Sequence, residues 1–246
     1  MNEAVLLFLA ACATALATGV GAIPVFLLGD RARALTPALL AFAAGVMAVA
    51  AVVGLLIPAG EEGSPSAVIG GVAVGVLFLA VVRRRIRPDL GFIGRTGPGA
   101  RTSALIFLVL FVHSLPEGLA IGTAFASDRA GLSLFVIVAI AIQNIPEGTS
   151  VAIPMQEAGF DRMRQFWAAV ATSAPQPIGA LIAFLAVEQV AGLLPFSFAL
   201  AAGAMLALIV AELLPQAYAG PRRLGPTAGL LLGAALMLAF SLALGV

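Results

Sequence analysis

Two copies of one polar hexapeptide stand out in an otherwise apolar sequence. They read HSLPEG at residues 113–118 and QNIPEG at 143–148, and they align without gaps. In each copy a polar side chain precedes a glutamate by four residues, which puts His113 beside Glu117 and Gln143 beside Glu147 on one helix face. One imidazole, two carboxylates and one amide oxygen suit Zn²⁺, Fe²⁺ or Mn²⁺, and the set lacks the thiolates that Cu⁺ prefers.

The composition places these motifs in a membrane protein. Of 246 residues, 61% are hydrophobic and 10% are charged, whereas a soluble domain is roughly half apolar and about a quarter charged. This balance excludes a soluble globule, a disordered tail and a nucleic-acid-binding module. Cys12 is the single cysteine and lysine is absent, so neither a disulfide framework within the chain nor a lysine Schiff base is possible.

Apolar runs of about 20 residues predict an all-α fold with eight transmembrane helices. The expected protein is one transmembrane domain over 1–246, with a cytoplasmic linker at 84–101 after the third helix. The predicted spans are 4–28, 35–57, 66–83, 102–126, 132–155, 163–187, 193–215 and 225–245.

Arginine placement predicts the orientation. Twelve of the 13 arginines fall in the loops after spans one, three, five and seven or at their edges, and only Arg129 falls on the other side. The positive-inside rule makes those four loops cytoplasmic and puts both termini outside. The expected protein is multi-pass, and its expected location is the plasma (inner) membrane.

The two motifs lie at matching depths in consecutive, antiparallel spans. His113 and Gln143 each lie 11 residues into a span, about 17 Å deep and close to the bilayer centre. Such copies are related by a pseudo-two-fold axis in the membrane plane, as in inverted-repeat transporters. Pro116 and Pro146 lack a backbone N–H, which frees a carbonyl in each helix and allows a kink.

Two ionised carboxylates near the bilayer centre cost at least several kcal/mol unless they are paired. The sequence offers no lysine and no arginine in the middle of any span. Three solutions follow: the glutamates are protonated, they share a proton in a relay, or they bind a cation from outside the protein.

At these residues the sequence resembles the ZIP family of divalent-metal transporters, in particular its bacterial GufA-like branch. Besides the doubled motif, the matching stretches are ATALATGVGAIP, AFAAGVM, APQPIGA and AAGAMLALIVAELLP. The resemblance implies a three-two-three arrangement of helices with an inverted repeat, a homodimer, and elevator-type alternating access. It also implies a principal metal site made by His113, Glu117, Gln143 and Glu147.

A second, adjacent metal site in the family would use the positions of Ser114, Asn144 and Gln176, bridged by Glu117 and Glu147. All three of these side chains are neutral here, so a second divalent ion would find no added negative charge. We therefore predict one occupied metal site per chain.

Two further residues are expected on the pathway, the first by resemblance and the second by its position. Met47 is expected on the entry route from outside, although an ordinary packing role explains it equally well. Glu212 lies near the cytoplasmic end of span seven, where it receives the departing ion or is simply an interfacial carboxylate.

The predicted function is transport of a divalent transition-metal cation from outside to the cytosol, with zinc foremost and iron, manganese or cadmium as other candidates. The metal is then a substrate, and the protein holds no cofactor, is not an enzyme and binds no nucleic acid. Two alternatives stay open. One is a membrane-embedded metalloenzyme that uses the same ligands to activate water. The other is a proton-coupled transporter of an organic solute, with the glutamate pair as the proton relay.

Overall fold

The computed structural model describes residues 2–85, 98–127 and 129–246, and in these ranges the regular structure is helical without a strand. Most of the expected linker 84–101 lies outside the described residues. Helix α5 continues to Arg85 and α6 begins at Pro98, so the linker's two ends are helical. The helices are α1 (Glu3–Val20), α2 (Ile23–Leu28), α3 (Asp30–Ala51), η1 (Val52–Leu56), α4 (Ile57–Glu62), α5 (Pro65–Arg85), α6 (Pro98–Ala126), α7 (Ala130–Glu157), α8 (Arg162–Thr172), α9 (Pro175–Gln189), η3 (Ala191–Leu193), α10 (Leu194–Leu208), η4 (Ile209–Leu213), α11 (Leu214–Ala217) and α12 (Leu224–Leu244).

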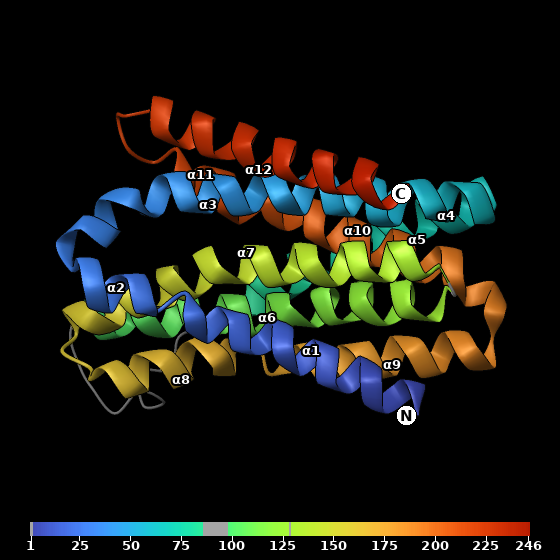
Figure 1. The fold of residues 1–246 in the computed structure, drawn as a ribbon, viewed down its shortest axis with the longest axis horizontal. Helices are drawn as coiled ribbons and strands as arrows, with labels where there is room; N and C mark the ends of the chain where they lie inside the picture. The colour runs from blue at the N-terminus through green and yellow to red at the C-terminus, as the bar shows by residue number, and fades with distance from the viewer. Residues whose placement is uncertain (1, 86–97, 128) are drawn as a thin grey trace.

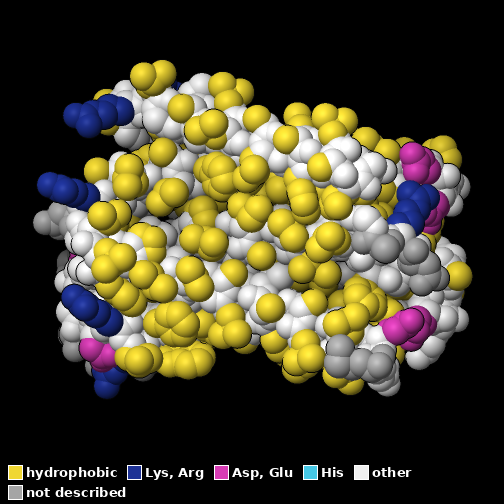
Figure 2. Space-filling model, in the orientation of Figure 1, with side chains coloured by type: hydrophobic (Ala, Val, Ile, Leu, Met, Phe, Trp, Pro, Cys, Tyr) yellow, Lys and Arg dark blue, Asp and Glu magenta, His cyan; other side chains and the backbone are white. Residues whose placement is uncertain are grey.

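Within the described ranges, eight helical segments are long and apolar enough to cross a membrane, which confirms the predicted all-α polytopic fold. They run side by side, and both ends of the chain lie at the same end of the bundle (Figure 1). Arginines gather at one end of the visible face and acidic side chains mostly at the other, with a hydrophobic belt between them (Figure 2). This charge distribution agrees with the expected orientation.

The helices can be divided into two groups, which meet mainly where α3 packs on α7 and where α6 packs on α10. The first group contains α1, α2 and α6–α9, and the second contains α3, η1, α4, α5 and α10–α12. In the second group the most extensive pairs are α3 with α12 and α5 with α10; in the first they are α6 with α9 and α1 with α7. If spans one to three are exchanged with six to eight, and span four with five, the pair of α3 with α12 maps onto that of α10 with α5. The same exchange maps the pair of α6 with α9 onto that of α7 with α1. The inverted repeat therefore extends beyond the two motif-bearing helices.

Glycines let helix backbones meet inside each group. A Cβ atom at Gly148 of α7 would lie 2.7 Å from the carbonyl carbon of Thr18 in α1, and one at Gly203 of α10 would lie 2.5 Å from the carbonyl oxygen of Val72 in α5. Between the groups, Gly54 instead faces the ring of Phe135, 3.0 Å from such a Cβ. Close backbone contact at glycines thus joins helices within each group.

Several spans depart from regular α-helix at points the sequence did not all predict. Span one breaks between Val20 and Ile23, span six breaks at Ser173, and spans two and seven each contain a π-helical turn, η1 and η4. By contrast, α6 and α7 remain α-helical through Pro116 and Pro146. The breaks and π-turns fall in spans that the inverted repeat relates, one with six and two with seven.

Candidate metal site

The two hexapeptides face each other across the contact between α6 and α7. His113, Glu117, Gln143 and Glu147 each have at most 1% of their surface exposed. Because the two helices are antiparallel and carry the motifs at equal depth, the four side chains meet inside the first helix group. The structure thus brings together all four residues that the sequence predicted for the principal site.

The spacing of the potential ligand atoms is close to that of a metal shell. The Nε2 atom of His113 lies 3.5 Å from Oε1 of Glu117 and 3.8 Å from Oε1 of Glu147. Ligand atoms of these three side chains all lie within 4.8 Å of one another. Zn²⁺ bound tetrahedrally at about 2.0–2.2 Å would need ligand separations near 3.3 Å, so the two distances from His113 exceed that value by only about 0.2 and 0.5 Å.

Several of these atoms lack a hydrogen-bond partner. Among the described residues, none bonds to either ring nitrogen of His113, to Oε1 of Gln143 or to Oε1 of Glu147, although all four atoms are buried. A buried polar atom without a partner costs about 1–3 kcal/mol. Lone pairs gathered in one buried place, beside two carboxylates, favour a cation as the missing partner.

Glu117 is held much more firmly than Glu147. Its Oε1 accepts a hydrogen bond of 2.5 Å from Nε2 of Gln143, and its Oε2 accepts one of 2.6 Å from Nε2 of Gln176. The first bond uses the amide nitrogen of Gln143 and so leaves its oxygen free to bind a cation. Gln176, on α9, was expected at a second metal site; here it adjoins the principal site and contacts Glu117 as a donor.

Of the other two residues of the expected second site, Ser114 bonds to its own helix, whereas Asn144 bonds to α1 and pairs with Gln176. The Ser114 hydroxyl donates to the backbone oxygen of Leu110 at 3.0 Å. Asn144 Nδ2 donates to the backbone oxygen of Thr14 at 2.7 Å and approaches Oε1 of Gln176 at 3.3 Å. This side of the site is therefore a network of neutral hydrogen bonds.

Sequence reasoning missed the residues that α1 adds to this network. Thr14 and Thr18 are each 1% exposed. The hydroxyl of Thr14 approaches Oε1 of Gln176 at 3.0 Å, and that of Thr18 lies 2.6 Å from Oγ of Ser173. Two hydroxyls four residues apart in an apolar span share one helix face, and that spacing was the available signal.

A cavity of about 400 Å³ opens toward the arginine-rich end, and we call it the vestibule. Leu110 and Ser150 lie at its inner end, about one helical turn from His113 and Glu147 respectively. Glu212 also lines it, paired with Arg83 at 2.6 Å. A second cavity of about 260 Å³ shares Leu40, Thr102, Ile106, Ser150 and Gln216 with it.

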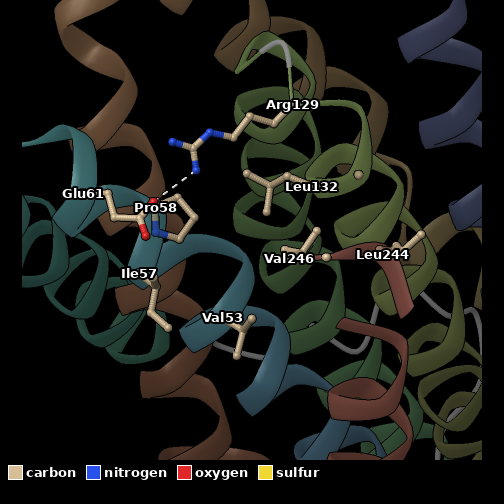
Figure 3. A pocket seen from close by; sticks show the side chains of 10 residues that line it. Val53, Ile57, Pro58, Glu61, Arg129, Leu132, Leu244 and Val246 are labelled. Atoms are coloured by element: carbon tan, nitrogen blue, oxygen red, sulfur yellow. Dashed lines mark hydrogen bonds and ion pairs between the residues drawn. The ribbon is translucent and has the colours of Figure 1, made fainter. Parts of the chain in front are cut away.

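At the opposite, acidic end, the residue expected on the entry route is buried. Met47 is 0% exposed and belongs to an apolar cluster that includes Leu55, Ile121 and Phe135. The outer cavity, of about 470 Å³, lies where α4, α7 and the end of α12 meet (Figure 3). There Arg129 bonds to Glu61 at 3.2 Å and to Glu62 at 2.7 Å. The site is thus closer to the vestibule than to the outer cavity.

Comparison with known proteins finds relatives that match most of the chain. A family model described as "ZIP Zinc transporter" matches residues 96–241. The zinc transporter GufA of Myxococcus xanthus is 34% identical over 241 residues, which cover 93% of this chain and 95% of GufA. The zinc transporter ZIPB of Bordetella bronchiseptica is 33% identical, covering 93% of this chain and 78% of ZIPB. A putative zinc transporter of Arabidopsis thaliana is 33% identical over 84% of this chain, which spans only 33% of that protein.

Proposed function

This chain belongs to the ZIP family of zinc transporters, and from that premise we propose that it carries Zn²⁺ from outside the cell to the cytosol through the site on α6 and α7. It is a multi-pass membrane protein that transports divalent metal, and its relatives are named transporters rather than enzymes. The metal is accordingly a transported substrate and not a cofactor.

The observation that carries the proposal is the set of buried lone pairs without partners on His113, Gln143 and Glu147. With Glu117, these side chains supply two negative charges for one divalent ion, so the occupied site would be neutral in the low-dielectric interior. We propose one ion per chain, because Ser114, Asn144 and Gln176 add no charge and are already hydrogen-bonded.

The proposed route uses the vestibule for release. An ion that leaves the four ligands toward the arginine-rich end passes Ser150 and then Glu212. Loading from outside requires the apolar cluster around Met47 to open, which a shift of one helix group against the other would achieve. We propose the plasma membrane as the location; a homodimer stays a prediction.

Uptake of ⁶⁵Zn²⁺ into proteoliposomes tests this function. We expect His113→Ala and Glu147→Gln to abolish uptake and to remove the bound zinc, because the first deletes a ligand and the second removes one of the two negative charges that neutralise the ion. Glu157→Gln is the matched control: it lies on the same helix, and its carboxylate instead meets Arg33 at 2.5 Å in an exposed ion pair.

Competition titration of the purified protein tests the stoichiometry. We expect one high-affinity zinc per chain in the wild type. Two tight sites would contradict the single-ion proposal, and unchanged uptake in both ligand variants would contradict the site itself.

A further inference from the structure

Glu117 is the one site carboxylate with protein donors on both oxygens, among the residues that the structure describes. The donor to Oε2 is the amide nitrogen of Gln176, at 2.6 Å. An amide can present either its NH₂ group or its oxygen to a neighbour. If the Gln176 oxygen faced the carboxylate, two buried acceptors would oppose each other, so the direction of this amide decides whether Glu117 is stabilised.

Two donors lie around the Gln176 oxygen. The Thr14 hydroxyl approaches it at 3.0 Å, and Asn144 Nδ2 approaches it at 3.3 Å. The same hydroxyl also lies 2.8 Å from the backbone oxygen of Ala11 in its own helix, so its hydrogen is shared between two acceptors. Thr14 further accepts the bond of 2.7 Å from Asn144 on its own backbone oxygen.

We infer that Thr14 is a positioning residue for the metal site: it orients the Gln176 amide, and Gln176 in turn holds Glu117 in place to bind the ion. This inference rests on the proposed function. Each residue in the chain from Thr14 through Gln176 to Glu117 is at most 1% exposed, so water does not substitute readily for a missing donor. Residues behind a metal ligand typically contribute about 10–100-fold to metal affinity.

Thr18 provides a matched control on the same helix. It lies one turn further along α1, is equally buried, and pairs with Ser173 rather than with Gln176. Thr14→Val and Thr18→Val therefore each remove one hydroxyl from an equally buried position on α1. Only the first variant removes a donor to the amide that holds Glu117.

The experiment is competition titration of purified wild type and variants with Zn²⁺ alone. We expect Thr14→Val to raise the zinc Kd about tenfold, the lower end of the range for residues behind a ligand. Thr14→Ser should restore the affinity to within about twofold, and Thr18→Val should leave it within the same limit. Thr14→Ala replaces Thr14→Val if the valine variant does not fold.

A double variant tests whether Thr14 acts through Gln176. We expect Thr14→Val combined with Gln176→Leu to bind zinc no more weakly than Gln176→Leu alone, because residues in one network do not contribute additively. Wild-type affinity in Thr14→Val and Thr14→Ala, equal weakening in Thr18→Val, or additive effects in the double variant would each overturn the positioning role. Failure of the proposed function is a separate result: His113→Ala would then bind zinc like the wild type.

Discussion

Replacement of Gly148 by alanine should loosen the contact between α1 and α7 and weaken the metal site with it. A Cβ atom there would lie 2.7 Å from the carbonyl carbon of Thr18 and closer still to its oxygen, whereas ordinary contacts begin at 3.4 Å. The carbonyl carbon alone requires the backbones to separate by about 0.7 Å, and the nearer oxygen requires more. Both partners are backbone atoms, so no side-chain rotation relieves the overlap.

The same movement reaches the hydrogen-bond network. Asn144 Nδ2 bonds to the backbone oxygen of Thr14 at 2.7 Å across this helix pair. A separation of about 0.7 Å stretches that bond to about 3.4 Å, beyond the 2.7–3.2 Å of a good N–H···O bond. Overpacking costs about 1–3 kcal/mol, and the weakened buried bond adds about 1 kcal/mol.

Thermal unfolding of the purified protein and ⁶⁵Zn²⁺ uptake measure the two effects. We expect Gly148→Ala to lower both the melting temperature and the uptake rate. Gly70→Ala is the control, because a Cβ atom at Gly70 of α5 would meet its first neighbour only at 4.0 Å. A Gly148→Ala protein that melts and transports like the Gly70→Ala protein would refute the packing argument.

Three further outcomes follow from the two ends of the pathway. Glu212→Gln should slow zinc uptake severalfold without changing the zinc Kd, because Glu212 lines the vestibule and bonds to Arg83 and Gln216 instead of a site ligand; a weaker Kd would show that it belongs to the site. In a background without Cys12, Ser150→Cys should react with a membrane-impermeant thiol reagent from the arginine-rich side, and Met47→Cys should not; labelling of both at equal rates would contradict the closed outer half. Arg129→Gln should change the free energy of unfolding by less than about 1 kcal/mol, since the arginine side chain is 44% exposed and exposed ion pairs contribute little to stability. Chemical denaturation measures this change, and a larger loss would contradict the expectation.

The sequence predicted the eight spans and the meeting of the two hexapeptides for clear physical reasons. The length of each hydrophobic run determines where a span lies. The two motifs align without gaps and lie at equal depth in antiparallel helices, so they are expected to face each other. The resemblance to the family, and not the spacing of the motifs, suggested Gln176 as a residue of an adjacent site. Its role as a donor to Glu117 depends on amide orientation, which spacing does not reveal.

Other features were beyond the sequence argument. The roles of Thr14 and Thr18 depend on which helix packs against α1, and an isolated span carries no such information. The π-turns η1 and η4 arise within apolar stretches that read as ordinary helix. A further internal similarity was available: AAGVM at 43–47 matches AAGAM at 201–205 in spans two and seven, and it would have revealed that the inverted repeat includes the outer spans.

The pairing of α3 with α12 has a consequence for biosynthesis. Gly45 of α3 packs against the backbone of Leu230 and Ala234 in α12. The second span to be translated therefore has this surface covered only after the eighth span has been made. Contacts so distant along the chain form late and slowly. During synthesis the early helices must therefore persist in lipid, or beside insertion factors, as separate and loosely associated rods. A chain that ends before residue 224 would lack α12 and would leave this surface of α3 uncovered, as a target for quality-control proteases.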